Sequence, residues 1–597
     1  MRRKSNLIKL GNDSESRELI FKIIIIFMFF ILASRMLYLQ IFQYTKYVEM
    51  SEENRIKLKR IEPERGKIYD RTGKILVTNG TGFRLIYLNE RKYDDETLDK
   101  ISKLTGFDKE FIEKRIKYGE LSTYTRENIL LENLDEKLAH KIIEKIDKDL
   151  PIMVEVYSKR KYIYNNLASH IIGYVKKISE KEFAQLKDEG YTQRDIIGKN
   201  GLEKQYDYLM RGIPGAERIE VNAYNRMSKK IDKKPPVNGK DLYLSINYEL
   251  QSYMESILKE ANLTGTVVTV NPKTGNLITM VSYPTYSLET FSSQISPEEW
   301  KAIVSDKRKP LNNKAIAGEY PPGSIYKPIS AFSFLSKGVD PSKEYFDPGY
   351  YEVGSWRWKA WKVGGHGYVN MTKSIIESVN PYYYRFADMF GYKGINEYAD
   401  MFGLGKPTGI DLPGEKIGVN PSPEWKRKKF KQSWYKGDSI NMSIGQGYVS
   451  VTPLQMLQVY SVLANKGYAY KPKLLKEIGE EKEKVEKEIA IKIELPSWYY
   501  ALMGEALRKT VAEDNGTTKI MRTPGINIGA KSGSAQNAQS KETHAWVAGY
   551  FPVEDPEVVF VVLLEGAGGG GKVAGGVAKQ FVDKYLELKN SGKFIVD

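Results

Sequence analysis

The hydrophobic and polar positions of this chain separate one long apolar run near the start from a mixed remainder. The run from Leu19 to Leu39 holds 21 residues, of which only Lys22, Ser34 and Arg35 are not apolar. As a helix it would measure roughly 31 Å, the thickness of a bilayer core. Because no Ala-x-Ala cleavage site follows it, we expect a retained transmembrane helix over 19–39, preceded by a tail over 1–18, rather than a cleaved signal peptide.

The charges beside this run predict which way it crosses the membrane. Five basic residues lie in the 18 positions before the run and three in the 18 positions after it. Positive charge is enriched on the cytoplasmic side of membrane spans, so the N-terminus and its tail are expected in the cytoplasm. The chain is then a single-pass protein of the cytoplasmic (inner) membrane, with its main part in the extracytoplasmic or periplasmic space, where ATP is absent.

The part that follows the run predicts a mixed domain. Residues 42–59 are polar and helix-prone, and the segment RGKIYDRTGKIL at 65–76 favours two short strands around a turn. Charged helical pieces are predicted at 94–115 and 136–148. A polar linker, IDKKPPVNGKD at 231–241, marks a domain boundary.

The pattern changes after this linker. TGTVVTVNPKTGNLITMVS at 264–282 predicts a β-hairpin, and three more strand patterns come late in the chain, in PGINIGAKSGSAQ (524–536), THAWVAGYF (543–551) and EVVFVVLLEG (557–566). The last helix is predicted at Val577 to Leu588. Strands at both ends of a helical middle indicate one α/β (α+β) domain whose sheet gathers elements distant in sequence.

Composition narrows the class of protein. The chain has 597 residues, 41% hydrophobic and 28% charged, as expected for a globular protein of two or more domains. Its net charge of +16 is compatible with nucleic acid, but no nucleic-acid-binding motif accompanies it, so no such partner is expected. The absence of cysteine excludes disulfides, cysteine nucleophiles and thiolate metal sites, and agrees with an exported enzyme.

A serine paired with a lysine is the first candidate for chemistry. In PPGSIYKPIS, Ser324 precedes Lys327 by three residues, so both lie on one helix face, where the lysine can take the hydroxyl proton. The same spacing recurs at Ser158 and Lys161, Ser256 and Lys259, and Ser433 and Lys436. Only Ser324 follows Pro-Pro-Gly and precedes an apolar stretch, which predicts a helix N-terminus whose dipole favours developing negative charge.

Two further motifs follow Ser324 in order. They are SVN at Ser378 to Asn380 and, in a predicted strand, KSG at Lys531 to Gly533. The ordered trio is the signature set of penicillin-binding proteins and serine β-lactamases. Copies of the second and third motifs, SIN at 439–441 and KTG at 273–275, are weaker candidates, since the latter comes too early and lies in a predicted hairpin turn.

One glycine-rich stretch imitates a phosphate-binding loop. GAGGGGKV has that spacing, but Val573 stands where a magnesium-binding serine or threonine belongs. We therefore interpret it as a flexible connection between a strand and a helix.

Beyond the trio, the chain resembles class B penicillin-binding proteins, which are monofunctional D,D-transpeptidases, from the apolar run to its end. RGKIYDRTG at 65–73, GKNGLEKQYDYLMRG at 198–212 and IGQGYVSVTPLQM at 444–456 resemble motifs of that family. GHG at 365–367 and GLGKPTGIDLPGE at 403–415 further resemble its penicillin-binding protein 2 branch, which serves lateral-wall growth during cell elongation.

The resemblance implies a three-part architecture after the cytoplasmic tail. A membrane helix is followed by an elongated, mixed α+β pedestal (dimerisation-like) domain over 40–236. A serine transpeptidase or β-lactamase-like domain over 237–597 then packs an antiparallel sheet against helices.

The resemblance also implies roles for the first two motifs. Ser324 is the expected nucleophile and Lys327, in its neutral form, its base. Ser378 is expected to carry the proton toward the leaving D-alanine amine, and Asn380 to hold the amide of the peptide.

The third motif is expected to bind substrate. Lys531 and the Ser532 hydroxyl receive the terminal carboxylate, with Gly533 and Ser534 completing this binding segment. The backbone N–H groups of Ser324 and Ser534 form the expected oxyanion hole.

The resemblance raises the question of a metal, because some lateral-wall relatives hold zinc through two aspartates, a histidine and a cysteine. Asp347 and His366 stand at two of these places, but Ala360 and Val379 stand at the others. Two ligands do not make a tetrahedral structural site, so no metal and no cofactor is expected.

The implied function is cross-linking of peptidoglycan stem peptides through a serine acyl-enzyme that β-lactams also acylate. The implied partners are a SEDS-family glycan polymerase and rod-shape scaffold proteins. A β-lactamase or β-lactam sensor, and a non-catalytic activator of a glycan polymerase, are alternatives; the retained anchor argues against the first and the intact trio against the second.

Overall fold

The computed structural model describes residues 13–48, 56–88, 93–120, 127–147, 150–221, 227–293, 295–536 and 542–594. It has a mixed α/β fold that divides into two units. One unit comprises residues 1–63 and 212–238, and the other comprises residues 64–211 and 239–597.

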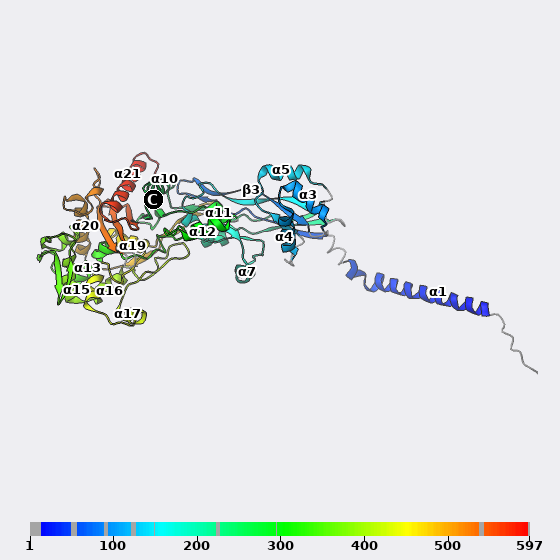
Figure 1. Ribbon diagram of the computed structural model, residues 1–597, viewed down its shortest axis with the longest axis horizontal. Coiled ribbons are helices and arrows are strands. Elements are labelled where there is room, and N and C mark those ends of the chain that lie inside the picture. The colour runs from blue at the N-terminus through cyan, green and yellow to red at the C-terminus, as the bar shows by residue number, and fades with distance from the viewer. Residues whose placement is uncertain are drawn as a thin grey trace, which may run out of the picture. The chain divides into compact units, whose positions relative to one another are not determined.

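The first unit contains the apolar helix. Helix α1 (Asp13–Leu37) continues into the π-helical turn η1 (Tyr38–Phe42), and together they include the expected span (Figure 1). The most apolar 18-residue window within residues 17–42 has a mean hydropathy of 2.3, and none of this window is buried, as suits a helix whose surroundings are lipid. Residues 1–12 of the expected tail lie outside the described residues.

The first unit also contains a three-stranded antiparallel sheet, β1 (Ile56–Ile61), β8 (Gly215–Val221) and β9 (Met227–Lys234). The prediction that residues 42–59 are helical is wrong for the last residues of this segment, which belong to β1 and pair with β8. The alternation of apolar and polar residues in IKLKRI fits a strand once a partner is present. The expected linker is likewise wrong at its start, because 231–234 belongs to β9.

The second unit contains a seven-stranded sheet assembled from segments on both sides of the expected domain boundary. In spatial order its strands are β19 (Glu483–Lys484), β18 (Leu475–Ile478), β10 (Leu242–Leu244), β2 (Ile68–Tyr69), β3 (Ile75–Leu88) and β4 (Glu127–Leu131), with β5 (Ile152–Tyr162) also on β3. The two strands and turn expected at 65–76 are confirmed as β2 and the start of β3, joined through Gly73 at φ +85°.

Helices and short strands accompany this sheet. They are α3 (Asp95–Thr105), α4 (Lys109–Glu120), α5 (Glu136–Lys145), α6 (Ser169–Ile172), β6 (Val175–Lys177), α7 (Glu180–Leu186), the 3-10 turn η2 (Lys187–Glu189), β7 (Ile196–Gly198), α8 (Gly201–Gln205) and α9 (Asp207–Met210). The helical piece expected at 94–115 is confirmed but divided in two, because Gly106 ends α3 in the left-handed region at φ +78°. The piece expected at 136–148 is confirmed as α5.

A buried ion network joins two of the sequence motifs. Arg65 Nε lies 2.7 Å from Glu203 Oε2, Arg65 Nη2 lies 2.7 Å from Asp207 Oδ1, and Arg160 Nε lies 2.7 Å from Glu203 Oε1. The Glu203 side chain is fully buried, so removing one partner would leave a buried charge uncompensated. The network therefore fastens residues 65–73 to residues 198–212.

A five-stranded antiparallel sheet forms the centre of the rest of this unit. In spatial order its strands are β12 (Leu277–Tyr283), β11 (Gly265–Val270), β23 (Val558–Leu564), β22 (Thr543–Phe551) and β21 (Gly529–Gln536). This confirms the expected antiparallel sheet built from elements distant in sequence, and the β11–β12 hairpin.

Alternate residues of this sheet enter two hydrophobic clusters. Val267, Val547 and Val562 pack with α10 (Tyr248–Glu260) and α21 (Val573–Asn590), which includes the helix expected at 577–588. Residues of the opposite parity, including Val268, Val561 and Trp546, pack with α19 (Pro453–Ala464), so helices cover both faces of the sheet (Figure 1).

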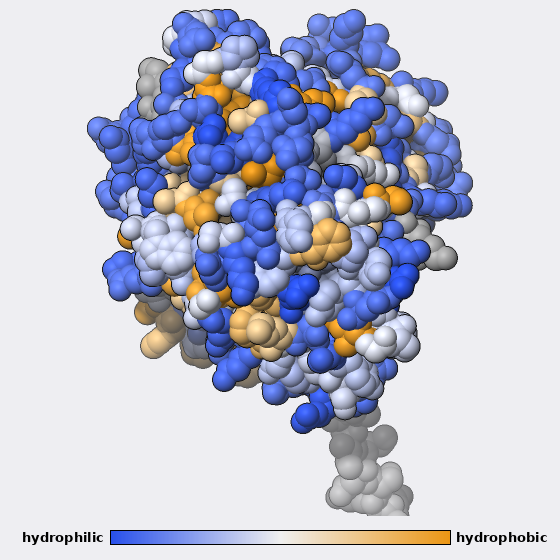
Figure 2. Space-filling view, turned by 90° about the vertical axis from the view of Figure 1, so that its left-hand side faces the viewer, coloured by the Kyte–Doolittle hydropathy of each residue, from blue (hydrophilic) through white to orange (hydrophobic). Residues whose placement is uncertain are grey.

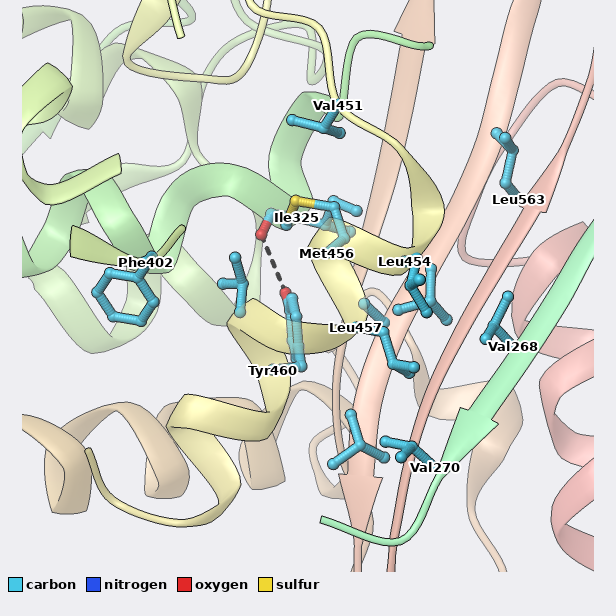
Figure 3. Packing of buried hydrophobic residues seen from close by; sticks show 14 of the residues in the cluster. Val268, Val270, Ile325, Phe402, Val451, Leu454, Met456, Leu457, Tyr460 and Leu563 are labelled. Atoms are coloured by element: carbon cyan, nitrogen blue, oxygen red, sulfur yellow. Dashed lines mark hydrogen bonds between the residues drawn. The ribbon is translucent and has the colours of Figure 1, made fainter. Parts of the chain in front are cut away.

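Every residue of α19 is buried, and the helix connects the sheet to the serine-x-x-lysine segment (Figure 3). Its Leu454 and Leu457 approach Val268 and Val270 of β11 (Figure 3). On its other side, Tyr460 Oη donates a hydrogen bond of 3.1 Å to the carbonyl of Ile325. The residue after Ser324 is thus fixed from the core.

Further helices and short strands complete the second unit. They are α11 (Leu288–Ser292), α12 (Pro297–Ser305), the 3-10 turn η3 (Gly323–Tyr326), α13 (Lys327–Ser336), β13 (Tyr345–Asp347), β14 (Tyr350–Val353), β15 (Trp356–Lys359), β16 (Gly367–Val369), α14 (Met371–Ile376), α15 (Asn380–Phe390), α16 (Lys393–Met401), α17 (Pro423–Phe430), α18 (Lys436–Met442), β17 (Tyr468–Tyr470), β20 (Ile489–Lys492), α20 (Ser497–Ala512) and the 3-10 turn η4 (Lys519–Met521).

The face seen in Figure 2 is mostly hydrophilic with dispersed hydrophobic residues, as expected for a surface in water.

Candidate active site

Ser324 lies in η3, immediately before α13. Gly323 adopts φ +58°, and its N–H donates a hydrogen bond of 2.9 Å to the carbonyl of Gly445, in the IGQG segment. Ser324 is half-buried while Ile325 and Lys327 are fully buried. The turn thus keeps the serine accessible and directs the lysine inward, and the expected helix start is confirmed.

Lys327 connects the first motif to the second. Its Nζ lies 2.7 Å from Asn380 Oδ1, 2.8 Å from the carbonyl oxygen of Ser378 and 3.2 Å from Ser378 Oγ. It also lies 5.1 Å from the centre of the Tyr383 ring. The structure thus brings together three residues that were predicted from two motifs, and adds an aromatic ring, Tyr383, that the motifs did not indicate.

Ser378 holds an unusual backbone conformation. Its φ is +56°, a region that non-glycine residues rarely adopt. The turn is secured on both sides, because Val379 N–H donates to the carbonyl of Ser374 at 2.9 Å, and Trp361 Nε1 donates to the carbonyl of Glu377 at 3.1 Å. These hydrogen bonds therefore hold the strained backbone of Ser378 at the position where Ser378 contacts Lys327.

Burial lowers the pKa values of both lysines in the site. Lys327 and Lys531 are 0% exposed. Burial, followed by the nearby charge of Lys531, holds the pKa of Lys327 well below its ordinary value. Burial lowers the pKa of Lys531 to about 7. The environment thus favours a neutral amine at Lys327.

The third motif lies on β21, the edge strand of the five-stranded sheet, as the sequence predicted for a strand. The outer edge of β21 faces the serine turn: Gln446 Nε2 lies 3.5 Å from the carbonyl oxygen of Ser534, and a Cβ on Gly323 would lie 3.1 Å from the same oxygen. The N–H and carbonyl of one strand residue point the same way, so the Ser534 N–H also faces this turn.

The glycine-rich stretch supports β21 from another direction. It connects β23 to α21, as expected, but Gly570 N–H also donates a hydrogen bond of 3.1 Å to Ser534 Oγ. A Cβ on Gly570 would lie 2.0 Å from the carbonyl oxygen of Gly533 and 2.4 Å from that of Trp546. This contact was not predicted from the sequence, where the run of glycines directly after a buried strand was its only signal.

The motif copies have structural partners. Lys273 lies in the β11–β12 turn, where its Nζ is 2.6 Å from Asp555 Oδ1. Ser439 Oγ accepts a hydrogen bond from Trp434 Nε1, and Asn441 Oδ1 accepts one from Trp358 Nε1. These copies therefore stabilise turns and helix contacts.

The residues at the zinc positions of some relatives do not fit a zinc site. His366 Nδ1 lies 2.6 Å from Asp347 Oδ2, and Gly349 N–H donates to Asp347 Oδ1 at 2.7 Å, so both carboxylate oxygens are engaged. Val379 is a buried apolar residue, and Ala360 offers no side-chain ligand. Within the described ranges, no group of three or more His, Asp or Glu side chains is placed to hold a metal.

The serine turn at the edge strand and the buried lysine beside it bring together the motifs that penicillin-binding proteins and serine β-lactamases share. The family model described as "Penicillin binding protein transpeptidase domain" matches residues 265–583, and "Penicillin-binding Protein dimerisation domain" matches residues 60–244.

Individual proteins are similar over nearly the whole chain. The "Peptidoglycan D,D-transpeptidase MrdA" of Haemophilus influenzae is 34% identical, with 92% of this chain and 88% of that protein covered. The structure titled "Complex between Penicillin-Binding Protein (PBP2) and MreC from Helicobacter pylori" has a TM-score of 0.81 at 29% identity, covering 90% of this chain and 100% of that chain. "Structural coordination of polymerization and crosslinking by a peptidoglycan synthase complex" has a TM-score of 0.72 at 26% identity, covering 96% and 98%.

The chain belongs to the peptidoglycan D,D-transpeptidases of the penicillin-binding protein 2 (MrdA) family. It is an enzyme of peptidoglycan synthesis that cross-links stem peptides during cell-wall growth. The resemblance stated from the motifs is confirmed.

Proposed function

We propose that Ser324 is the nucleophile of this transpeptidase and Lys327 its base. The observation that carries the proposal is Lys327 Nζ, fully buried, with a lowered pKa and bonded to both Ser378 and Asn380. A neutral Lys327 takes the proton of Ser324 Oγ as the oxygen attacks the carbonyl that precedes the terminal D-alanine. A covalent ester with Ser324 forms as the bond to that D-alanine breaks.

The second motif transfers the proton and holds the peptide. Ser378 Oγ, 3.2 Å from Lys327 Nζ, relays the proton to the D-alanine amine as it leaves. Asn380 positions Lys327 through its Oδ1 and binds the substrate amide. A second stem peptide then supplies the amine that attacks the ester, which forms the cross-link and frees Ser324.

The third motif binds the substrate and stabilises charge. Protonated Lys531 and the Ser532 hydroxyl receive the terminal carboxylate, and Gly533 and Ser534 line the strand along which the peptide lies. The N–H groups of Ser324 and Ser534 stabilise the oxyanion, an arrangement in which each donor contributes roughly 10² to 10³ in rate.

We propose the membrane topology and the division of the chain from the apolar helix and the charges beside it. Residues 1–18 form a cytoplasmic tail and 19–39 the single span, with the enzyme in the periplasmic or extracytoplasmic space. Residues 40–236 serve as the pedestal and 237–597 as the transpeptidase domain, in line with the two family matches.

Two related structures support a proposal about partners. One contains penicillin-binding protein 2 with MreC, and another is a peptidoglycan synthase complex of polymerisation and crosslinking. We propose that this chain works with a rod-shape scaffold protein of that kind and with a SEDS-family glycan polymerase.

Covalent labelling of the full-length protein with a fluorescent penicillin tests the site. Ser324→Ala should abolish the label, whereas Ser256→Ala and Ser433→Ala should leave it intact. Mass spectrometry should find a lasting adduct on Ser324. Label on Ser324→Ala would refute the assignment, and rapid return of free enzyme would favour a β-lactamase.

A further inference from the structure

The second motif begins where helix α14 ends. The N–H of Val379 donates a hydrogen bond of 2.9 Å to the carbonyl of Ser374, and the N–H of Ser378 donates one of 3.3 Å to the carbonyl of Ile375. A helix end of this pattern places Ser378, at φ +56°, where glycine is the usual residue. A serine keeps this conformation only where its surroundings determine it. The contacts around Ser378 therefore decide where its hydroxyl lies.

Three successive carbonyls at this helix end are bonded by three distant segments. The last carbonyls of a helix have no partner within it. The carbonyl of Ile376 accepts from a backbone N–H between α20 and η4 at 3.3 Å, and the carbonyl of Glu377 accepts from Trp361 Nε1 at 3.1 Å. The carbonyl of Ser378 accepts from Lys327 Nζ at 2.8 Å. Of these donors, only Lys327 belongs to the motifs.

The ring of Trp361 is held by a buried pair of residues. Trp361 is 62% exposed, so its own burial contributes little to keeping the ring in place. The ring packs against His366 in a T-shaped arrangement, with 5.4 Å between the ring centres. The His366 imidazole is fully buried, and its Nδ1 lies 2.6 Å from Asp347 Oδ2. The pair therefore fixes the exposed ring whose N–H reaches Glu377.

The loop that carries Trp361 is fastened to α14 itself. Lys373 of α14 donates from its Nζ to the carbonyl of His366 at 2.8 Å. Gly365 has φ +77°, and a Cβ there would lie 2.2 Å from the carbonyl oxygen of Asp347, so the loop lies close against β13. The indole N–H is therefore held at a defined position relative to the end of α14.

We propose that Trp361 is a positioning residue of the transpeptidase reaction. Its indole N–H holds the carbonyl of Glu377, and this sets Ser378 Oγ at 3.2 Å from Lys327 Nζ. The inference rests on the proposed function, in which Ser378 relays the proton from Lys327 to the leaving amine. Without the indole N–H, the Glu377 carbonyl loses its partner, and the strained backbone of Ser378 relaxes and moves the hydroxyl away from Lys327.

The test follows acylation of the full-length protein by a fluorescent penicillin at increasing concentrations, which separates the limiting rate of acylation from the apparent dissociation constant. Trp361→Phe keeps an aromatic ring beside His366 and removes the N–H. Its limiting rate should fall at least about tenfold, because a misplacement of about 1 Å near reacting groups costs up to about 10² in rate. Its dissociation constant should stay at the wild-type value. Complete labelling at long times shows that the variant is folded.

Two further variants isolate the N–H. Trp356→Phe removes the same group from a tryptophan of β15 that is 73% exposed and whose indole N–H has no partner among the described residues, so its limiting rate should equal that of the wild type. Trp361→His restores a donor, because Nε2 of histidine lies as many bonds from the backbone as Nε1 of tryptophan. This variant should acylate faster than Trp361→Phe.

A variant without the Ser378 hydroxyl tests the route by which Trp361 acts. Ser378→Ala alone should slow acylation by about 10², as loss of a proton-transfer group predicts. Adding Trp361→Phe to Ser378→Ala should change the limiting rate by less than about twofold, since the hydroxyl that Trp361 positions is absent and the two effects are then not additive. A substitution that merely disturbed the fold would slow both backgrounds alike.

The outcomes separate this inference from the proposed function. A wild-type limiting rate in Trp361→Phe, a loss confined to the dissociation constant, no recovery in Trp361→His, or an equal loss with and without the Ser378 hydroxyl would each overturn the positioning role and leave Ser324 as the nucleophile. Acylation of Ser378→Ala at the wild-type rate would instead overturn the proton relay of the proposed function.

Discussion

Lys327 Nζ lies 2.7 Å from Asn380 Oδ1, so the amine of the first motif is held by the amide of the second. Its three polar contacts equal the three donors of an ammonium group. A neutral amine keeps two donors for the two shorter contacts and has a lone pair in place of the third, longest one. The lowered pKa of Lys327 favours this second state.

Replacing Asn380 by aspartate should shift the pH dependence of acylation. A carboxylate beside Lys327 stabilises the ammonium and raises its pKa. Since the base acts only when neutral, the limb of the profile that rises with pH should move up by about one to three pH units. The measurement is the second-order rate constant for fluorescent penicillin as a function of pH. Asn380→Ala is the control, since it removes the amide without adding charge; an unmoved limb in Asn380→Asp would argue against Lys327 as base.

Lys531 should produce a second, falling limb. Burial lowers its pKa from the ordinary 10.5 to about 7, so the free enzyme loses the cation that we propose receives the substrate carboxylate as pH rises through about 7. The second-order rate constant should therefore decline above neutral pH. Lys531→Arg keeps the charge at all these pH values and should remove the decline, even if the overall rate is lower. A decline that persists in Lys531→Arg would assign the limb to another group.

The two lysine-hydroxyl-glycine copies should differ sharply when their lysines are removed. Lys531→Ala should slow acylation of Ser324 at least about tenfold, because a charge-assisted hydrogen bond to the carboxylate is lost. Lys531→Met, which retains most of the volume, should behave alike and excludes a cavity effect. Lys273→Ala should react at the wild-type rate, since it removes only a solvent-exposed ion pair with Asp555. Equal losses at both lysines would mean that the wrong strand was chosen.

The sequence could predict those parts of the site for which the residue type and its neighbours in the chain are enough to indicate the chemistry. Among the four serine-x-x-lysine pairs, Ser324 could be selected because Pro-Pro-Gly precedes it. The same residues predicted that a helix begins there. The left-handed Ser378 and the ring of Tyr383 beneath Lys327 could not be predicted, because both depend on packing between segments far apart in the chain. The strand at 56–61 was missed for the same reason, since its partner β8 comes much later. Sequence also indicated the positive charge of Lys531 but not the burial that lowers its pKa.

The contact of Gly570 with β21 predicts that a glycine outside the motifs supports acylation. A methyl group at Gly570 would lie 2.0 Å from the carbonyl oxygen of Gly533, closer than any real contact, so the strand or the loop must move. A misplacement of about 1 Å near reacting groups costs up to about 10² in rate. Gly570→Ala should therefore slow penicillin acylation at least about tenfold and lower the free energy of unfolding by about 1–3 kcal/mol. Gly569→Ala is the matched control, because a Cβ there meets nothing within 4 Å. Stopped-flow acylation and thermal unfolding of both variants distinguish the cases: equal behaviour of the two would show that the loop does not support the strand.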